Sequence, residues 1–356
     1  MTSNSPTLPT PRPWLSALNP YIPGEPALDP LGSLASNENP LGPSPQVVSA
    51  LEEPLADLAR YPDALSNELV SEIAKKYGVS EQSVLVGNGS DELIQLLVTA
   101  YAAFGGRVVC ADPPYQLHEK LPAMLGASVT KVPLTNFTHD LSTMATVDAE
   151  LAFVCNPHNP TGTLLEAEAI THFARASSSR LTVVDEAYIE YAQPAGAADP
   201  SLIRQAAAGE LAVLRTFSKF YGLAGLRIGF LVAAPEIIST LTAIRLPFGV
   251  NRIAQTAASI ALTDSSHGNT VRETNAHVRD RLTSLFKNAG YEVIPSHTNF
   301  VLVVTSEEPA LVRRLADEGV RVRPGSSLGL PGTVRVSVPN EAGLAKLEAI
   351  SWLTAL

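Results

Sequence analysis

The 356-residue sequence has only two cysteines, no block of basic residues and no long apolar segment. Two cysteines exclude a disulfide framework, and because Cys110 and Cys155 each lie in an apolar run, we expect buried thiols and no metal site. A net charge of −10 argues against nucleic acid or anionic membrane as a partner. No run is long enough to span a membrane, and residues 1–13 resemble a flexible arm rather than a signal peptide. We therefore expect a cytoplasmic protein.

Apolar runs that alternate with helical segments fill the middle of the chain. Such alternation predicts an α/β fold with a mostly parallel seven-stranded sheet flanked by helices. In sheets of this kind, ligands bind beyond the carboxyl ends of the strands. The expected strands are residues 84–86, 108–111, 129–132, 151–155, 181–184, 211–215 and 228–232. The expected helices include 47–58, 67–77, 91–101 and 166–176.

After residue 232 the pattern changes to that of a smaller α+β lobe. The segment before residue 45 is too rich in proline and glycine for a helix. We therefore predict an N-terminal arm (1–40) that joins the small lobe, a large domain (41–250) and a small C-terminal domain (251–356). Beyond residue 232 we expect a helix at 235–244, one or two long helices over 253–289, helices at 309–318 and 341–353, and strands at 291–294, 300–304, 320–323 and 334–338.

A lysine that follows one of the expected strands suggests the chemistry. Lys219 follows Thr216 and Ser218, and Arg227 comes after a glycine-rich turn. A lysine amine can form a Schiff base with an aldehyde, and hydroxyl groups with an arginine suit a phosphate monoester. Pyridoxal phosphate carries both groups. A single loop lysine is usually a solvated surface residue, so this assignment depends on the other strand ends.

Two other strand ends carry residues that suit the same molecule. The segment 87–92 opens a helix with Gly89, Ser90 and Asp91, where free amides and the helix dipole favour a phosphate, although the same residues are also common helix caps. Tyr115, held between prolines and the next helix, could stack on a flat pyridine ring or could be a core residue.

The remaining strand ends supply an amide, a carboxylate and a phenol. Asn159 could donate to a phenolate oxygen, whereas the neighbouring His158 is left without a role. Asp185 needs a partner at a buried strand end, and a protonated pyridine nitrogen would be one, although capping of the next helix is the alternative. Tyr188 could reach the oxygen on the other side of the ring.

Aspartate, tyrosine and lysine in this order, each just past an apolar strand, form a specific combination. With them, the sequence resembles the fold-type-I pyridoxal-phosphate aminotransferases, in the branch of histidinol-phosphate and aromatic (phenylalanine) aminotransferases. The resemblance covers nearly the whole chain, from residue 21 to residue 338. The matching motifs are Asn37-Glu38-Asn39-Pro40, Arg60-Tyr61-Pro62-Asp63, Gly89-Ser90-Asp91-Glu92, Asn159-Pro160-Thr161-Gly162, Asp185-Glu186-Ala187-Tyr188 and Ser218-Lys219 with Arg227.

The resemblance implies a homodimer with shared active sites, in which Tyr61 reaches the cofactor phosphate of the neighbouring subunit. Lys219 would bind pyridoxal 5′-phosphate covalently and move protons, with Asp185 and Tyr188 as the other catalytic residues. Tyr115 would stack on the ring, and Asn159 would tune it. The implied phosphate ligands are Gly89, Ser90, Asp91, Thr216, Ser218 and Arg227.

The resemblance also implies a ping-pong transfer of an amino group to 2-oxoglutarate from histidinol phosphate or from an aromatic amino acid. Arg335 would bind the substrate carboxylate and Arg323 the substrate phosphate, while Tyr21 and Asn37 would contact the substrate. Two departures from the pattern, His118 in place of a second aromatic residue and Pro324 after Arg323, weaken the choice of substrate. An amino-acid-phosphate decarboxylase and a non-catalytic effector sensor of this fold are the alternatives.

Overall fold

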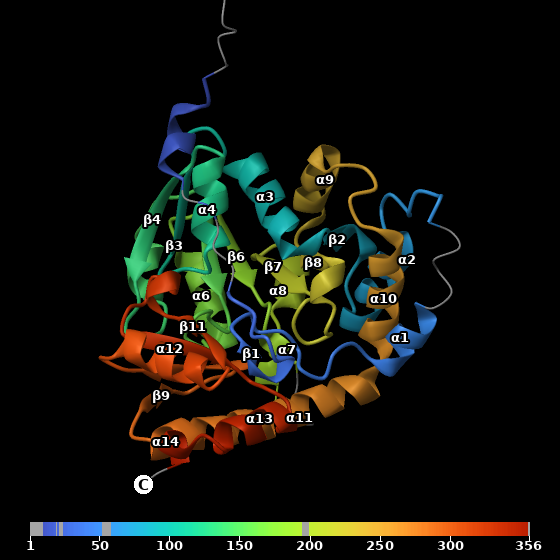
Figure 1. Cartoon of the computed structure of the whole chain (residues 1–356). Coiled ribbons are helices and arrows are strands. Elements are labelled where there is room, and N and C mark those ends of the chain that lie inside the picture. The colour runs from blue at the N-terminus through green and yellow to red at the C-terminus, as the bar shows by residue number, and fades with distance from the viewer. Residues whose placement is uncertain (1–9, 19, 21–23, 52–57, 194–198, 355–356) are drawn as a thin grey trace, which may run out of the picture.

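The computed structural model describes residues 10–18, 20, 24–51, 58–193 and 199–354. The described chain forms a seven-stranded sheet and a five-stranded sheet. Figure 1 shows the large sheet between its helices, with the C-terminal helices gathered below it. None of the described helices is long and apolar enough to cross a membrane. Cys110 and Cys155 are free and buried, as expected.

The large sheet has the predicted architecture. Its strand order is β2-β8-β7-β6-β5-β3-β4, and all neighbours are parallel except β8, which is antiparallel to β2 and to β7. The strands are β2 (Val84–Gly87), β3 (Arg107–Asp112), β4 (Ser128–Pro133), β5 (Leu151–Cys155), β6 (Leu181–Asp185), β7 (Ala212–Thr216) and β8 (Gly229–Val232).

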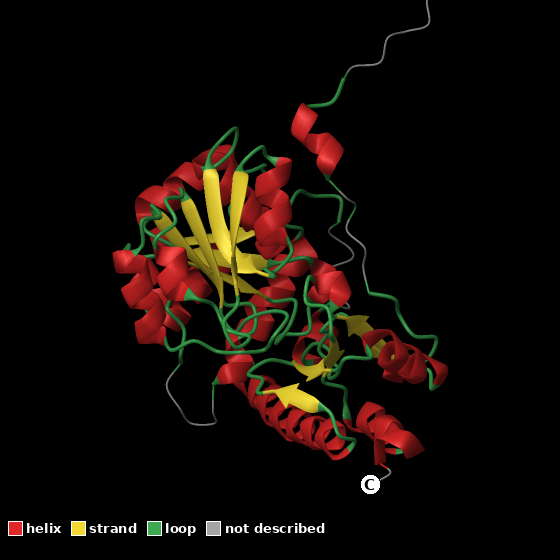
Figure 2. Ribbon diagram, turned by 90° about the vertical axis from the view of Figure 1, so that its left-hand side faces the viewer, coloured by secondary structure: helices red, strands yellow, loops and turns green. Residues whose placement is uncertain are grey.

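Helices cover both faces of the large sheet, as Figure 2 shows. Side chains alternate along each strand, so Val184 and Val213 contact one hydrophobic cluster while Val183 and Leu214 contact the other. This two-sided burial explains the nearly continuous apolar runs. One face carries α1 (Pro45–Ala50), α2 (Asn67–Tyr77), α5 (Leu141–Ala145), α6 (Ala167–Ala176), α8 (Ile203–Ala207) and α10 (Arg252–Thr263). The other face carries α3 (Gly89–Tyr101), α4 (Leu117–Met124) and α9 (Pro235–Ile244).

The small sheet brings the two ends of the chain together. Its order is β1-β11-β12-β10-β9, and β1 pairs in parallel with β11 through Ser33 and Arg321. The arm before the large sheet therefore contributes a strand to the C-terminal lobe. The elements are β1 (Ser33–Leu34), β9 (Glu292–Ile294), β10 (Phe300–Val304), β11 (Arg321–Pro324), β12 (Thr333–Ser337), α11 (Ser265–Asn288), α12 (Glu308–Asp317), α13 (Glu341–Glu348) and α14 (Ser351–Thr354).

The predicted elements differ from the structure mainly where helices break or are short. The segment 253–289, expected to hold one or two helices, holds two, because the chain breaks at Asp264, whose carboxylate accepts a hydrogen bond from the backbone N–H of His267 and caps α11. The expected helix 341–353 is divided into α13 and α14. The expected helix 47–58 corresponds to α1, and residues 52–57 lie outside the described chain.

The transition between the two hydrophobic cores falls inside α11. Val271 belongs to a cluster of the large sheet, whereas Val278, Leu282 and Phe286 belong to the cluster of the small sheet. The buried alanines of α10 also pack with the large sheet. The domain boundary expected at residue 250 stays a prediction, but the packing places α10 with the large sheet.

Candidate active site

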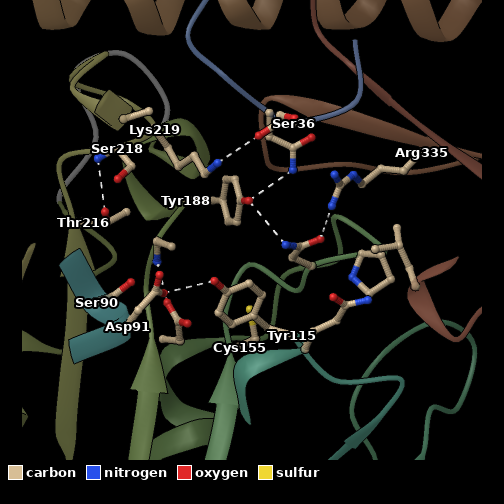
Figure 3. A pocket seen from close by; sticks show the side chains of 18 of the residues that line it. Ser36, Ser90, Asp91, Tyr115, Cys155, Tyr188, Thr216, Ser218, Lys219 and Arg335 are labelled. Atoms are coloured by element: carbon tan, nitrogen blue, oxygen red, sulfur yellow. Dashed lines mark hydrogen bonds between the residues drawn. The ribbon is translucent and has the colours of Figure 1, made fainter. Parts of the chain in front are cut away.

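A cavity of about 190 Å³ lies where the strands of the large sheet end against the small sheet. Figure 3 shows the side chains that point into it. Of the residues singled out from the sequence, the cavity is lined by Asn37, Ser90, Asp91, Tyr115, Asn159, Asp185, Tyr188, Thr216, Ser218, Lys219, Arg227, Arg323 and Arg335. The fold thus gathers residues that are up to 298 positions apart in the chain, from Asn37 to Arg335.

One end of the cavity is built to hold an anion. The first turn of α3 starts at Gly89, which has a φ of +77°, and a Cβ atom there would lie 2.8 Å from Nη2 of Arg227. Arg227 Nη1 donates to Oγ of Ser218 at 3.3 Å, and Nη2 donates to Oδ2 of Asp91 at 3.1 Å. Free backbone amides at a helix start, together with a guanidinium, suit a phosphate. Because its carboxylate already holds Arg227, Asp91 would serve a phosphate through its backbone N–H.

Lys219 lies beside this anion site, and its ammonium group is held toward the N-terminal segment. Its Nζ donates to the backbone oxygen of Ser36 at 3.0 Å. Burial, followed by the charge of nearby Arg335, lowers the pKa of Lys219 from 10.5 to about 8. A larger fraction of this amine is therefore neutral, and so nucleophilic, near pH 7 than for an ordinary lysine.

Asp185 is fixed by two contacts at the end of β6. Its Oδ1 accepts from the backbone N–H of Ala187 at 3.1 Å, and its Oδ2 lies 3.1 Å from Nε2 of His118. The His118 ring stacks on Phe153, with ring centroids 4.6 Å apart. The carboxylate therefore closes a local turn and lines the cavity, whereas the next helix, Ile189–Ala192, has Tyr188 at its N-cap and no side-chain cap.

Tyr115 links the anion end of the cavity to the surroundings of Asp185. Its hydroxyl donates to Oδ1 of Asp91 at 3.2 Å, and its ring meets His118 edge to face at 5.2 Å. Burial raises the pKa of Tyr115 well above its ordinary value, so the hydroxyl keeps its hydrogen. The phenol anchors the ring at the cavity wall.

Tyr188 stands at the centre of a buried polar network on the opposite wall (Figure 3). Its hydroxyl accepts from Nδ2 of Asn37 at 3.1 Å and from Nδ2 of Asn159 at 3.4 Å. Arg335 donates through Nη1 to Oδ1 of Asn159 and through Nη2 to the backbone oxygen of Ala35, both at 2.7 Å. Burial raises the pKa of Tyr188 to about 12.

Two arginines lie side by side on neighbouring strands of the small sheet. Arg323 of β11 and Arg335 of β12 are direct cross-strand partners, and both line the cavity. They are 5% and 6% exposed, respectively, so both charges are largely removed from solvent. Two guanidinium groups on one wall place several hydrogen-bond donors at the cavity, and such groups suit carboxylates and phosphates.

A buried ion cluster supports the strand ends from behind. Arg215 of β7 donates to Oε1 of Glu190 at 2.7 Å and to Oε2 of Glu186 at 3.2 Å. Burial raises the pKa of Glu186 to about 7. Glu186 and Glu190 lie on either side of Tyr188 in the chain. The cluster therefore ties the turn that contains Tyr188 to β7, the strand that precedes Lys219.

One residue predicted for the site, Tyr61, lies outside the cavity of its own chain. Tyr61 is 78% exposed, stacks on Phe248 with ring centroids 4.6 Å apart, and does not line the cavity of its own chain. Tyr21 lies outside the described residues.

Three residues that support the site from outside its lining were not found from the sequence. His118 was noted only as a departure from a pattern, although its position three residues after Tyr115 could have suggested a contact nearby. Ser337 and Asn299 hold the segment around Asn37. Nothing in their local sequence indicates this role, because both contacts span more than 250 residues.

The fold and the arrangement of this cavity define the class of protein. An amine, a carboxylate and a phenol meet an anion site at the strand ends of a mostly parallel seven-stranded sheet. This is the architecture of the fold-type-I pyridoxal-phosphate aminotransferases.

The chain belongs to the family described as aminotransferase class I and II, whose model matches residues 30–348. It is 40% identical to a histidinol-phosphate aminotransferase of Moorella thermoacetica, over 93% of this chain and 89% of that protein. It is 37% identical to another from Caldicellulosiruptor saccharolyticus, over 93% and 96% of the two chains. Its structure is similar to that of histidinol-phosphate aminotransferase from Sinorhizobium meliloti in complex with pyridoxal-5′-phosphate, with a TM-score of 0.86, 28% identity and 98% coverage of both chains.

The lowered pKa of Lys219 gives a prediction that needs no cofactor. Trace labelling of cofactor-free protein with acetic anhydride, followed by digestion and mass spectrometry, should show Lys219 half-maximally reactive near pH 8. The reason is that only the neutral amine reacts, and the neutral form appears at lower pH than in a lysine with the ordinary pKa of 10.5. The exposed Lys287 in the same digest is the internal reference. Equal pH profiles for the two lysines would contradict the prediction.

Proposed function

We propose that this protein is a pyridoxal-phosphate aminotransferase that converts histidinol phosphate and 2-oxoglutarate to imidazole-acetol phosphate and glutamate in two ping-pong half-reactions. The observation that carries the choice of substrate is the pair Arg323 and Arg335, in register on neighbouring strands and both lining the cavity. The named relatives support the same choice.

The side chains of the cavity fit pyridoxal phosphate. The start of α3, where a side chain at Gly89 would collide with Arg227, together with Ser218 and Thr216, would hold the phosphate. Asp185 would pair with the pyridine nitrogen, Tyr115 would stack on the ring, and Asn159 and Tyr188 would face its phenolate oxygen. When bound, the cofactor supplies an electron sink for the bonds at the substrate α-carbon.

Lys219 would attach the cofactor and then act as the proton carrier. Its Nζ would take the proton from the carbon that bears the substrate amino group and pass it to C4′ of the cofactor, and in the second half-reaction it would carry a proton in the opposite direction. A pKa of about 8 suits both directions, because catalysis by a base is efficient when its pKa lies near the working pH.

The arginine pair would accommodate both substrates of the cycle. A carboxylate is satisfied by one guanidinium in a two-pronged contact, whereas a dianionic phosphate has oxygens left for a second. Arg335 would therefore bind both glutamate and histidinol phosphate, and Arg323 would act mainly on the phosphate. Asn37 would contact the substrate from the same wall, and Tyr21 is proposed as a lid on the basis of the sequence alone.

We also propose that the protein is a homodimer in which Tyr61 serves the partner's cofactor phosphate. Tyr61 is exposed and stacks on Phe248, and Leu246, two positions before Phe248 in the chain, is 73% exposed. A cluster of exposed large apolar residues is typical of a protein–protein interface. The cytoplasmic location expected from the sequence stays a prediction.

Removing the charge of Asp185 should slow the chemistry. In Asp185→Asn, the pyridine nitrogen would lose the carboxylate that keeps it protonated, so the glutamate half-reaction should slow by about a hundredfold or more. The change is measured from the cofactor absorbance in a single turnover. The control Asp140→Asn alters a carboxylate that only caps α5 and should keep the wild-type rate. A near-normal rate in Asp185→Asn protein that has bound the cofactor would show that Asp185 has only a structural role.

Truncating Arg323 should separate the two half-reactions. Arg323→Ala or Arg323→Lys should cost histidinol phosphate about 2–3 kcal/mol in kcat/KM, as expected for a lost charge-assisted contact, while the glutamate half-reaction changes much less. Arg321→Ala, on the same strand but outside the cavity lining, is the control. Equal losses in both half-reactions, or a tenfold preference of the wild type for phenylalanine, would favour the aromatic aminotransferase instead.

The proposed role of Tyr61 can be tested by mixing inactive chains. If Tyr61 acts across the interface, a mixed dimer of Tyr61→Phe and Lys219→Ala subunits places both lesions in the same site, so that the other site is intact and activity returns. The experiment requires that Tyr61→Phe alone is clearly impaired and that mixed dimers are verified by mass. Absence of recovery in such dimers would show that Tyr61 does not act across the interface.

A further inference from the structure

Three buried polar side chains connect the small sheet to Tyr188. The backbone N–H of Asn37 donates to Oγ of Ser337 at 2.9 Å, and the Ser337 hydroxyl lies 2.9 Å from Oδ1 of Asn37. Nδ2 of Asn37 then lies 3.1 Å from the Tyr188 hydroxyl. Asn37, Ser337 and Tyr188 are each at most 3% exposed. Their polar hydrogen atoms must therefore be donated to buried acceptors rather than to solvent.

The contact with Arg335 determines which way the side-chain amide of Asn159 is turned. A guanidinium can only donate, so the amide atom of Asn159 that lies 2.7 Å from Nη1 of Arg335 must be the oxygen. The amide nitrogen of Asn159 therefore faces Tyr188 and donates to its hydroxyl oxygen.

The direction of the Asn37 amide follows from Ser337. Because Oγ of Ser337 accepts the backbone N–H of Asn37, the hydroxyl hydrogen is left to donate, and among its contacts Oδ1 of Asn37 is the acceptor. Turning the amide over would present two donors to each other or leave the buried hydroxyl hydrogen unpaired, which is unfavourable. Asn299 holds the same segment by donating to the backbone oxygen of Asn37 at 3.0 Å.

The orientations of the two amides together determine whether the Tyr188 hydroxyl donates or accepts in the cavity. A tyrosine oxygen has two acceptor positions, and the amides of Asn37 and Asn159 fill both. The hydroxyl hydrogen must then be donated, and within the described chain no acceptor contacts it, whereas the side chain lines the cavity. We propose that Ser337 is a positioning residue that, through the amide of Asn37, makes Tyr188 a hydrogen-bond donor into the cavity.

This inference rests on the proposed function, since the acceptor in the cavity would be the phenolate oxygen of the cofactor. A donor at that oxygen stabilises its ionised form and lowers the pH at which it ionises. Loss of the Ser337 hydroxyl frees the Asn37 amide to turn over and accept the Tyr188 hydrogen. The ionisation of the bound molecule should then move to higher pH, although Ser337 itself does not touch it.

The probe for this test is 4-deoxypyridoxine 5′-phosphate, which lacks the aldehyde and so cannot bond to Lys219. It is added to cofactor-free protein, and the absorbance of its ring hydroxyl is titrated with pH. In Ser337→Ala the midpoint should rise by about one pH unit relative to the wild type, the size expected for one lost net hydrogen bond. Asn37→Asp, whose carboxylate can only accept, should raise it at least as much. Ser337→Thr retains the hydroxyl and should restore the midpoint.

The matched control is Thr333→Val, which removes a buried hydroxyl from the same strand that donates to Leu330 and has no contact with Asn37. Its midpoint should equal that of the wild type. The inference is overturned if Ser337→Ala and Asn37→Asp bind the probe with the wild-type midpoint, or if Thr333→Val shifts it equally. If the wild type does not bind the probe at all, the proposed function fails together with the inference.

Discussion

The site depends on one short segment, Ala35 to Asn37, wedged between the two sheets. Its three residues contact the three groups that define the chemistry. The oxygen of Ala35 accepts from Arg335, the oxygen of Ser36 accepts from Lys219, and the side chain of Asn37 donates to Tyr188. β1 directly precedes this segment in the chain and pairs with β11. The pairing of strands at one edge of the small sheet therefore positions the groups at the strand ends of the large sheet.

A concentration of positive charge in an acidic protein is the second physical constraint. Lys219, Arg227, Arg323 and Arg335 line one cavity in a chain with a net charge of −10. Burial together with Arg335 lowers the pKa of Lys219 to about 8, so the charges that would bind anionic ligands also make the amine a better nucleophile. The overall charge therefore says little about the ligand, because the local arrangement of arginines outweighs it.

Buried contacts behind the cavity hold the residues that line it in place. The cluster around Arg215 joins the turn that carries Tyr188 to the strand that leads to Lys219. His118 holds Asp185 from the side away from the cavity lining, while its own ring is stacked on Phe153. The reactive groups are thus supported by buried partners that would not touch a ligand, which is how a site keeps its geometry before the ligand arrives.

The sequence by itself determined the large sheet and the residues at its strand ends. Apolar runs buried on both faces have a local signature, and Asp185, Asn159 and Lys219 follow directly from where such runs stop. The sequence also predicted the C-terminal strands of the small lobe, but not the pairing of β1 with β11, nor the break between α13 and α14. Only the tertiary structure decided that Ser337 contacts Asn37 and that His118 contacts Asp185. The physical reason is that strand and helix periodicity are properties of neighbouring residues. The partner of a buried polar group is instead whichever donor or acceptor the packing of distant segments brings within hydrogen-bonding distance.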